Sequence, residues 1–424
     1  MPKIEKIRGM SDLTPQELSV WSCAEEAIKE SFLSYGFQEI RFPILENSNL
    51  FTRSNNSSEM VTKQMYSFED KGGDSISLRP EGTASCVRAA IENDLIRTDK
   101  ARLWYMGPMF RYERPQKGRS RQFHQSSAEI FGHASFEADL ELIQLSNRIW
   151  KKLDIDSDII LEINNIGDKN TRKKYTEALK EYLQPLVSSF DEESLKTLQN
   201  NPLRILDTKN PKILNTIQDA PNINDFLDDK SLNDFESLKD SLAKNSIKFT
   251  VEHRLVRGLD YYNGTVFEWK SDSLGSQDTV CGGGRYDRLV EELGGKPCPA
   301  AGFSIGMERL ILILSNHTSL NNSIQNNVDF YFVCLDQESI VEAMIISDEI
   351  RNEIPKINLK VNLGSEKAST QFKRADKINA RFALILGQEE RKKGIISLKN
   401  LKNQEQKEIP SKNLIGVLKE YTGN

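Results

Sequence analysis

The sequence predicts an α+β core with an antiparallel β-sheet flanked by helices, a small helical insertion and a C-terminal α/β domain. Three observations support this prediction. Short strand-like runs dominate the first part of the chain, and few of them are separated by helices long enough to cross over between parallel strands. A charged helical stretch interrupts these runs at about residues 167–240. After residue 328, strands alternate with helices.

The first predicted helix begins after the segment TPQE at residues 14–17, which has the pattern of a capping box with proline in the first turn. Apolar residues recur at helical spacing from Leu18 to Phe32, and Gly36 is expected to end the helix. Strand-like runs then follow one another. They lie at residues 37–42, 75–78, 101–111, 121–129 and 159–163.

The chain changes character in its middle, where charged helical segments at 172–186 and 233–243 replace the strands. Strand character returns at 248–252 and 264–269. A polar segment without periodicity, residues 317–327, is a predicted linker. Beyond it, a small α/β domain with a largely parallel sheet is predicted from strands at 328–335, 359–363, 382–386 and 395–398 and helices at 338–350 and 367–378.

These patterns predict three domains in the 424 residues, a length that is enough for about two to four domains. The core comprises residues 1–166 and 251–320, the helical insertion residues 167–250, and the C-terminal α/β domain residues 328–424. The composition, with 38% hydrophobic and 28% charged residues, is that of an ordinary globular protein.

The net charge changes meaning when it is divided along the chain. The whole sequence has 57 Lys and Arg against 62 Asp and Glu, which taken alone argues against a nucleic-acid partner. Residues 356–424, however, hold 15 Lys and Arg against 7 Asp and Glu, and the remaining residues hold 42 against 55. An acidic body therefore precedes a basic tail that can attract RNA phosphates.

Several classes of protein are excluded early. The longest apolar run, near residues 310–314, is far shorter than the roughly 20 residues that span a bilayer. The N-terminus has no apolar signal region. Five scattered cysteines without a CxxC pair indicate reduced thiols and no zinc site, and four histidines without an HExxH motif argue against a histidine-based metal centre, so no side chain is assigned to a metal. We therefore expect a cytoplasmic protein that does not span a membrane.

The densest chemical motif is FRYERPQKGRSRQFHQ at residues 110–125, with four arginines, one lysine and one glutamate. Two strand-like segments flank a loop at 115–118, which predicts a hairpin. Arg111 and Glu113 then share one face, and Arg119 and Arg121 share a face on the returning strand. Converging guanidinium groups can clamp a polyphosphate, because each offers paired donors to phosphate oxygens. The alternative is a solvated basic hairpin.

Three further motifs combine glycine with charged or aromatic residues. LVRGLDYY at 255–262 could place Arg257 and two tyrosines in a binding site. The alternative is an ordinary glycine turn beside a buried tyrosine. The next motif is CGGGRYDR at 281–288, followed by AAGFSIGMERL at 300–310. Its glycines would allow a ligand to approach the backbone closely; the alternative is a tight turn before a core helix. LRPEGT at 78–83 presents Glu81, which could hold an ammonium group, although turn chemistry is the favoured explanation of this segment taken alone.

Taken together and in order, these motifs resemble the histidyl-tRNA synthetase family of class II aminoacyl-tRNA synthetases. Residues 36–46 resemble motif 1, which forms a dimer interface in the class, residues 110–125 resemble motif 2, and residues 302–309 resemble motif 3. LVRGLDYY and GGGRYD resemble the histidine-binding signatures of the family. Further matches are IRGMSDLTP at 7–15, NPLRILD at 201–207 and RADKINARFALILG at 374–387.

The resemblance implies an ATP site built on motifs 2 and 3. Arg111 and Arg309 would hold the phosphates, and Arg119 and Arg121 would assist them. Glu113 would face the adenine, and Phe123 would stack on it. Gln116, in the loop of the hairpin, falls where the family contacts the acceptor end of the tRNA.

The resemblance also implies a histidine site. Arg257 corresponds to the catalytic arginine of the family and would lie against the α-phosphate and the substrate carboxylate, with Arg111 as the second catalytic cation. The α-amino group would be bound by three side chains, and the imidazole ring by three more. The first set is Glu81, Thr83 and Gln125, and the second is Glu129, Tyr262 and Tyr286.

The implied reaction has two steps: histidine and ATP form histidyl-adenylate, which then reacts with tRNA(His). The implied cofactors are ATP and Mg²⁺, and the implied assembly is a homodimer. One alternative is a catalytically silent relative that acts as a regulatory subunit of ATP phosphoribosyltransferase. Such relatives lack the C-terminal domain and degrade LVRGLDYY, whereas Arg257, Asp260 and Tyr262 are intact here. A second alternative is another ATP-dependent ligase on the same core.

Overall fold

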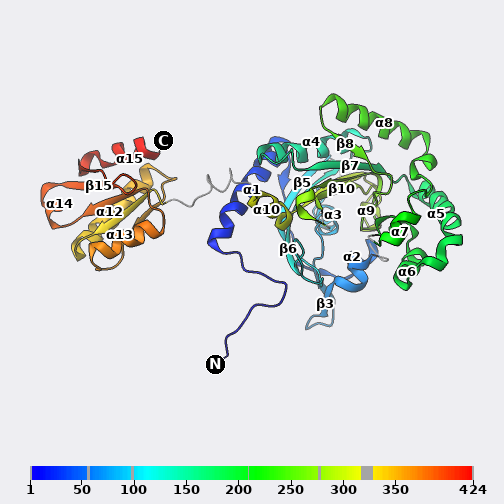
Figure 1. The fold of residues 1–424 in the computed structure, drawn as a ribbon, viewed down its shortest axis with the longest axis horizontal. Coiled ribbons are helices and arrows are strands. Elements are labelled where there is room, and N and C mark those ends of the chain that lie inside the picture. Colours follow the sequence, from blue (N-terminus) through cyan, green and yellow to red (C-terminus); the bar gives the residue numbers. More distant parts are fainter. Residues whose placement is uncertain are drawn as a thin grey trace. The chain divides into compact units, whose positions relative to one another are not determined.

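The structure is a computed structural model that describes residues 2–54, 58–96, 100–208, 210–275, 278–316 and 328–422. The chain divides into two compact units, Met1–Asn321 and Asn322–Asn424 (Figure 1). The predicted linker at 317–327 lies outside the described residues. The boundaries of the three predicted domains stay a prediction.

An eight-stranded sheet forms the centre of the first unit. Its neighbouring strands pair antiparallel, except for the parallel pairs β1·β5 and β7·β8. The predicted antiparallel core is therefore confirmed, with parallel strands at both edges. In spatial order the strands are β1 (Gln38–Glu39), β5 (Arg102–Phe110), β6 (Gln122–Phe131), β11 (Ala300–Gly306), β10 (Thr279–Arg285), β9 (Asn263–Lys270), β7 (Ile160–Asn165) and β8 (Phe249–Val251).

Helices cover one face of this sheet. Helix α1 (Pro15–Ser34) begins with the predicted capping box, in which the Thr14 amide donates to Glu17 Oε2 at 2.8 Å. It packs with α4 (Glu137–Lys152) and α10 (Met307–Ser315) on a buried apolar cluster that includes Trp104 of β5. Because side chains alternate along a strand, Leu103 and Tyr105 belong to the cluster on the opposite face.

The opposite face carries smaller elements that were not predicted individually, apart from the strand at 75–78. They are the antiparallel three-stranded sheet β2 (Leu45–Asn47), β4 (Ser75–Leu78) and β3 (Tyr66–Glu69), the helices α2 (Asn49–Ser54), α3 (Thr83–Glu92) and α9 (Leu289–Glu292), and the π-helix Met60–Gln64. The 3-10 turn Asp272–Leu274 instead packs on the face of α10, where Leu274 joins the apolar cluster. The strand expected at 37–42 is reduced to the two residues of β1.

The helical insertion is part of the first unit, and both of its predicted helices are present with shifted ends. Figure 1 shows its helices, coloured green, grouped on the right of the first unit in this view, near the end of the sheet that carries β7 and β8. Tyr175 and Leu179 share an apolar cluster with Val266 of β9, whereas Phe235 joins the cluster on the other face. The elements are α5 (Lys169–Leu183), α6 (Glu192–Asn200), α7 (Pro211–Thr216), α8 (Asp229–Lys244) and the 3-10 helices Gln184–Ser189, Pro202–Asp207 and Ile223–Phe226.

The C-terminal unit has a five-stranded sheet with its own buried clusters. The pairs β13·β12 and β12·β14 are parallel, but β14·β15 and β15·β16 are antiparallel, so the sheet is mixed and not largely parallel. The strands are β13 (Leu359–Val361), β12 (Phe330–Cys334), β14 (Phe382–Leu386), β15 (Ile395–Asn400) and β16 (Gln406–Pro410); the helices are α12 (Gln337–Glu353), α13 (Ala368–Lys377), α14 (Gln388–Lys393), α15 (Leu414–Thr422) and a 3-10 turn, Ser411–Asn413.

The basic tail is a part of this unit and not a unit of its own. Residues 328–355 contribute β12 and α12 to the same sheet and core, and they are acidic. Over residues 328–424 the counts are therefore 16 Lys and Arg against 14 Asp and Glu. Within the described residues, no helix is long and apolar enough to cross a membrane. All five cysteines are free thiols.

Candidate active site

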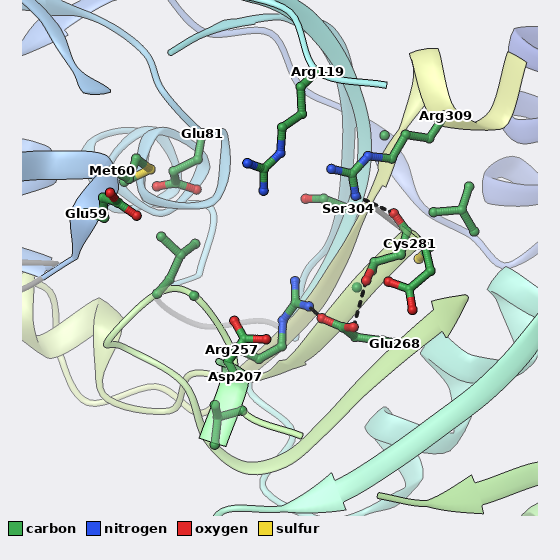
Figure 2. Close-up of a pocket in the computed structure, with 18 of the residues that line it drawn as sticks. Glu59, Met60, Glu81, Arg119, Asp207, Arg257, Glu268, Cys281, Ser304 and Arg309 are labelled. Atoms are coloured by element: carbon green, nitrogen blue, oxygen red, sulfur yellow. Dashed lines mark hydrogen bonds and ion pairs between the residues drawn. The ribbon is translucent and has the colours of Figure 1, made fainter. Parts of the chain in front are cut away.

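A cavity of about 690 Å³ lies in the first unit, at the sheet face that carries the sequence motifs. Figure 2 shows Arg119, Arg257 and Arg309 extending toward the same open space from different elements, with Glu81 across it. Ten of the predicted site residues line the cavity: Glu81, Thr83, Arg111, Glu113, Arg119, Phe123, Gln125, Arg257, Tyr262 and Arg309. The other four, Gln116, Arg121, Glu129 and Tyr286, are not among its lining residues.

The predicted hairpin is formed by β5 and β6, which pair from Arg102↔Ile130 to Phe110↔Gln122. Past the last pair, the Arg111 amide donates to the Arg121 carbonyl at 2.9 Å, and Gln116 and Arg119 form an isolated bridge near the tip. The Arg121 amide donates to the Gly9 carbonyl at 2.7 Å, and its guanidinium lies 3.9 Å from the centre of the Tyr112 ring. Arg121 therefore braces the loop in this structure.

Three guanidinium groups, those of Arg111, Arg119 and Arg309, form what we call the arginine cluster. Backbone carbonyls anchor two of them: Arg111 Nε donates to Pro80 O at 2.8 Å, and Arg309 Nη1 donates to Thr279 O at 2.6 Å. Arg111 also lies over the Phe123 ring, 5.1 Å from its centre. The nearest carboxylate is Glu113, with Oε2 3.3 Å from Arg119 Nε and Oε1 3.9 Å from Arg111 Nη1.

The electrostatics of the arginine cluster favour an anionic ligand. Burial lowers the pKa of the Arg111 guanidinium, even though Glu113 opposes the shift. Burial also lowers the pKa of Arg309, and the like charge of Arg119 adds to this effect. A lowered pKa means that the positive charge is poorly compensated where it stands. The oxygens of a polyphosphate would supply that compensation.

Two buried carboxyl groups, Glu81 and Glu129, form the carboxylate cluster on the same face. Glu81 accepts from the amides of Thr83, at 2.6 Å, and Ala84, at 2.9 Å, at the start of α3. Burial raises the pKa of Glu81, although these hydrogen bonds and Arg111 oppose the rise. The two clusters meet here, because Pro80, which binds Arg111, directly precedes Glu81.

Glu129 is fully buried, and three hydroxyl groups donate hydrogen bonds to its carboxyl group. Thr83 Oγ1 and Tyr105 Oη each donate to Glu129 Oε1 at 2.9 Å, and Tyr286 Oη donates to Oε2. Burial raises the pKa of Glu129 to about 8, although the hydrogen bonds from the three hydroxyls lower it in part. Because burial disfavours its charged form, Glu129 would gain from a ligand that brings a hydrogen-bond donor or a positive charge, which makes it a candidate binding group.

Three tyrosine rings pack against one another between the cavity lining and the hydroxyl group that binds Glu129: Tyr261 and Tyr262 line the cavity, and Tyr286 donates to Glu129. The ring centres of Tyr261 and Tyr262 are 4.9 Å apart, and that of Tyr286 lies 5.7 Å from the first and 6.4 Å from the second. Tyr262 lines the cavity, and burial raises its pKa to about 12. Tyr286 belongs to the same ring cluster but does not line the cavity. Gln125 also lines the cavity, and its buried Oε1 has no hydrogen-bond partner among the described residues.

Arg257 is held in place by an acidic residue that the sequence did not reveal. Its Nη1 pairs with Glu268 Oε1, and Glu268 Oε2 accepts from Thr279 Oγ1 at 2.8 Å (Figure 2). Burial by itself would lower the pKa of Arg257, but the Glu268 carboxylate raises it above its ordinary value. Glu268 was missed because it is one residue in the strand GTVFEWK, and nothing in that segment marks the side chain that faces Arg257.

The glycine run of CGGGRYDR lies on the central strand β10, which corrects the alternative of a tight turn. Its glycines are required by close approach: a Cβ on Gly282 would lie 2.4 Å from Arg257 Nη2. On the neighbouring strand, a Cβ on Gly302 would lie 1.6 Å from Glu129 Oε2. Both glycines therefore make room for ionisable side chains of the site, and both lie on strands of the central sheet.

Two neighbouring features were not assigned to the site. His124 has its ring Nδ1 3.0 Å from Glu308 Oε1 and its ring edge on Trp21, so it joins β6 to α10 and α1. The insertion also contributes a wall of the cavity through Arg204, Leu206, Asp207, Thr208 and Leu214. The sequence placed the motif NPLRILD in the insertion but gave it no role at the site.

An antiparallel sheet that carries a basic hairpin, a glycine-rich central strand and an arginine at the start of the helix after its last strand defines the core of a class II aminoacyl-tRNA synthetase. Residues 9–310 match the sequence model of the histidyl-tRNA synthetase family, and residues 329–421 match that of the anticodon binding domain. The chain therefore belongs to the histidyl-tRNA synthetase family.

Solved structures agree with this assignment. The chain is similar to apo histidyl-tRNA synthetase of S. aureus, with 32% identity, a TM-score of 0.81, and 98% of this chain and 100% of that chain covered. Histidyl-tRNA synthetase of Nostoc sp. PCC 7120 shares the fold at 21% identity and a TM-score of 0.70, covering 99% and 100% of the two chains. A protein of Bacillus halodurans described as an ATP phosphoribosyltransferase regulatory subunit/histidyl-tRNA synthetase shares it at 21% identity and 0.66, covering 91% and 99%.

Proposed function

We propose that this chain is a histidine–tRNA ligase, which uses ATP to activate L-histidine and transfers the histidyl group to the 3′ end of tRNA(His). The observation that carries the proposal is that a desolvated arginine cluster lines the cavity and adjoins a buried carboxylate cluster, of which Glu81 also lines it. The first suits a polyphosphate, and the second suits an ammonium group and an imidazole. Family membership supports the same activity.

In the first step, an oxygen of the histidine carboxylate would attack the α-phosphorus of ATP, and the bond to the bridging oxygen of pyrophosphate would break. Arg111 and Arg257 would stabilise the charge that develops at the α-phosphate, while Arg309, Arg119 and, from the loop, Arg121 would hold the outgoing pyrophosphate. Glu113 and Phe123 would position the adenine. Catalysis would therefore depend on positioning and electrostatics.

Selection of histidine would depend on the carboxylate cluster. Glu81, Thr83 and Gln125 would bind the α-amino group, and the unpaired Oε1 of Gln125 is a suitable acceptor for it. Glu129 and Tyr262 would bind the two imidazole nitrogens once the ring reaches them, with Tyr286 closing the site behind. A substrate without those nitrogens would leave buried polar groups unpaired, a loss that can reject it by about 10⁴-fold or more.

Mg²⁺ belongs to the same proposal. Mg²⁺ is usually held by substrate phosphates with one or two carboxylates, and Glu113 and Glu268 both line the cavity beside the arginines. Each of these carboxylates already pairs with an arginine, Glu113 with Arg119 and Glu268 with Arg257, so the phosphates would supply most of the ligands of an ion that offsets phosphate charge when bound. In the second step, the 3′-hydroxyl of the terminal adenosine would displace AMP, and Gln116 at the tip of the hairpin would contact the acceptor end of the tRNA.

We further propose a cytoplasmic homodimer. Support for a second copy comes from β1, which is an edge strand, and from apolar side chains beside the motif 1 segment that are exposed in a single chain: Leu33, Ile44 and Leu45. A particle mass near twice 48.3 kDa in light scattering would agree with a dimer, and a mass near 48.3 kDa would contradict it. Free cysteines support a reducing compartment.

The regulatory-subunit alternative is less well supported. A protein with that description shares the fold at 21% identity, which concerns the architecture alone. This chain has a C-terminal region that matches an anticodon binding domain and an intact LVRGLDYY segment with Arg257 inside the cavity. Charging of tRNA(His) with labelled histidine and ATP tests the proposal. Charged tRNA is expected, and its absence in the presence of active histidine activation would contradict the second step.

Removal of residues 328–424 separates the two steps. This region has its own buried clusters, so the first unit should fold without it. Because the cavity lies wholly in the first unit, histidine activation should fall by less than about threefold, whereas tRNA charging should fall by about 10²-fold or more through lost RNA contacts. Equal losses in both assays would contradict the division of roles.

A further inference from the structure

The motif NPLRILD of the insertion has no role in the function proposed above, yet it lies against the loop that carries Arg257. Arg204 Nη2 donates to the Gly258 carbonyl and also lies 3.3 Å from Asp260 Oδ1. Asn201 Nδ2 donates to the same oxygen of Asp260 at 3.1 Å. The motif forms the 3-10 helix Pro202–Asp207, and Asp207 at its end reaches the cavity (Figure 2).

The loop in question connects β8 to β9 and has little regular structure of its own. Its first part is fixed by the core, because Asn164 Nδ2 donates to the carbonyls of His253 at 3.1 Å and Leu255 at 3.0 Å. Its second part, residues 256–262, contains both Arg257 and Tyr262. Side chains of the insertion donate hydrogen bonds to this second part.

A third contact from the insertion reaches the end of the loop. Arg172 of α5 donates from Nη1 to the Tyr262 carbonyl at 2.9 Å. The contacts of Arg204 and Asn201 lie one and three residues after Arg257, and that of Arg172 lies on Tyr262 itself. The insertion therefore holds the backbone on the far side of Arg257, while Glu268 and Gly282 of the sheet contact its guanidinium group.

We propose that Arg204 is a positioning residue for histidine activation, which acts with Asn201 by fixing Gly258 and Asp260 so that Arg257 and Tyr262 face the cavity together. The inference rests on the function proposed above. Arg204 has the geometry for this task, because both contacts are made by Nη2, whose two N–H bonds lie in the fixed plane of the guanidinium group. A lysine ammonium group is a point charge without such a plane, so it would hold the loop with a less defined geometry.

Loss of Arg204 should change the kinetics in a particular pattern. A loop released on one side would place Arg257 less accurately, and misplacement by about 1 Å can cost roughly 10²-fold in rate. Tyr262 would move with it, so the KM for histidine should rise. The arginine cluster is fixed by Pro80 and Thr279, which lie outside the loop. The KM for ATP should therefore stay nearly constant.

The test is histidine-dependent ATP–pyrophosphate exchange with the full chain and Arg204→Ala, Arg204→Lys and Lys196→Ala variants. Lys196 is an exposed cation of α6 in the same insertion and serves as the matched control. We expect Arg204→Ala to lower kcat about 10- to 100-fold and to raise the KM for histidine about tenfold, with the KM for ATP within about twofold. Arg204→Lys should recover part of both losses, and Lys196→Ala should match the unchanged protein.

The KM for histidine distinguishes positioning from misfolding, because a fraction of inactive protein lowers kcat without changing either KM. Asp260→Asn combined with Arg204→Ala should be little worse than Arg204→Ala alone, since both changes release the same loop. The inference is overturned if Arg204→Ala retains the kcat and the histidine KM of the unchanged protein, if Arg204→Lys, the milder change, alters neither, or if the double variant shows fully multiplied losses. Absence of exchange in the unchanged protein would instead overturn the proposed function.

Discussion

The arginine cluster lines the cavity and the carboxylate cluster adjoins it, reaching it through Glu81, but the two are built on opposite principles. The arginines are anchored by backbone carbonyls, and burial lowers the pKa of Arg111 and Arg309. The carboxyls are anchored by amides and hydroxyls, and burial raises the pKa of Glu81 and Glu129. In each cluster the protein therefore fixes the geometry and leaves much of the charge compensation to the ligand.

Arg257 differs from both clusters, and this difference is informative. It has a carboxylate partner in Glu268, and its pKa is raised, so it needs no ligand to carry its charge. A residue that is charged and held in place before the substrate arrives suits the stabilisation of charge that appears only in the transition state. We expect the substrate-binding clusters to determine mainly KM and Arg257 to determine mainly kcat.

The largest effect should come from Arg257→Ala. Loss of one preorganised donor typically costs about 10²–10³-fold in rate, and this variant also loses the partner of Glu268. Histidine-dependent exchange should become barely measurable, while the circular dichroism spectrum should stay unchanged. Exchange close to that of the unchanged protein would show that Arg257 is not the arginine that stabilises the transition state.

The second effect should come from Glu129→Gln in the carboxylate cluster. The amide keeps the size of the side chain but cannot carry negative charge or accept donors at both positions. We expect kcat/KM for histidine to fall by about 10²-fold, mainly through a higher KM for histidine, because the imidazole donor would meet a poorer acceptor. The KM for ATP should hardly change. A change confined to ATP would contradict the assignment of this cluster to the amino acid.

The mirror-image change in the arginine cluster is Arg309→Ala, with a smaller expected effect because Arg111 and Arg119 remain. The KM for ATP should rise about tenfold, the loss of one charge-assisted contact, with the KM for histidine within about twofold. Steady-state exchange at varied ATP and at varied histidine would measure both. Equal rises in the two KM values would mean that the clusters do not act on separate substrates.

The smallest effect concerns stability and pH. The pKa of Glu129 is raised to about 8 from its ordinary value near 4.5, so the folded chain binds more protons than the unfolded chain between these values. Its contribution to stability is therefore present in full below pH 4.5 and is lost as pH rises through 8. Relative to the unchanged protein, the Tm of Glu129→Gln should increase by about 2–4 °C or more from pH 5 to pH 8. A constant difference would mean that Glu129 is ionised throughout.

Local sequence signals predicted local structure well. The TPQE segment forms its capping box at α1, and the strand at 75–78 has its predicted bounds, because cap and alternation patterns depend on neighbouring residues. The basic hairpin likewise needed only its own sixteen residues. The ten predicted side chains that do line one cavity were placed by the resemblance to a family, because elements far apart in sequence contribute to that cavity.

What could not be predicted depends on contacts across the sheet. Gly282 of CGGGRYDR and Gly302 of β11 were ambiguous, since only Arg257 in the β8–β9 loop and Glu129 on β6 explain why no Cβ is tolerated there. Glu268, the partner of Arg257, occurs in an ordinary strand sequence. The basic tail was defined by counting charges, yet the acidic helix α12 belongs to the same core. In each case the residues that explain the local structure lie outside the motif or segment on which the prediction was based.

The central claim is that the two clusters recognise ATP and histidine in one cavity, and ATP–pyrophosphate exchange tests it most directly. Purified protein should exchange labelled pyrophosphate into ATP with histidine and, at equal concentration, with no other amino acid above background, because only histidine satisfies Glu129 and Tyr262 together. No exchange with histidine, or equal exchange with several amino acids, would contradict the account.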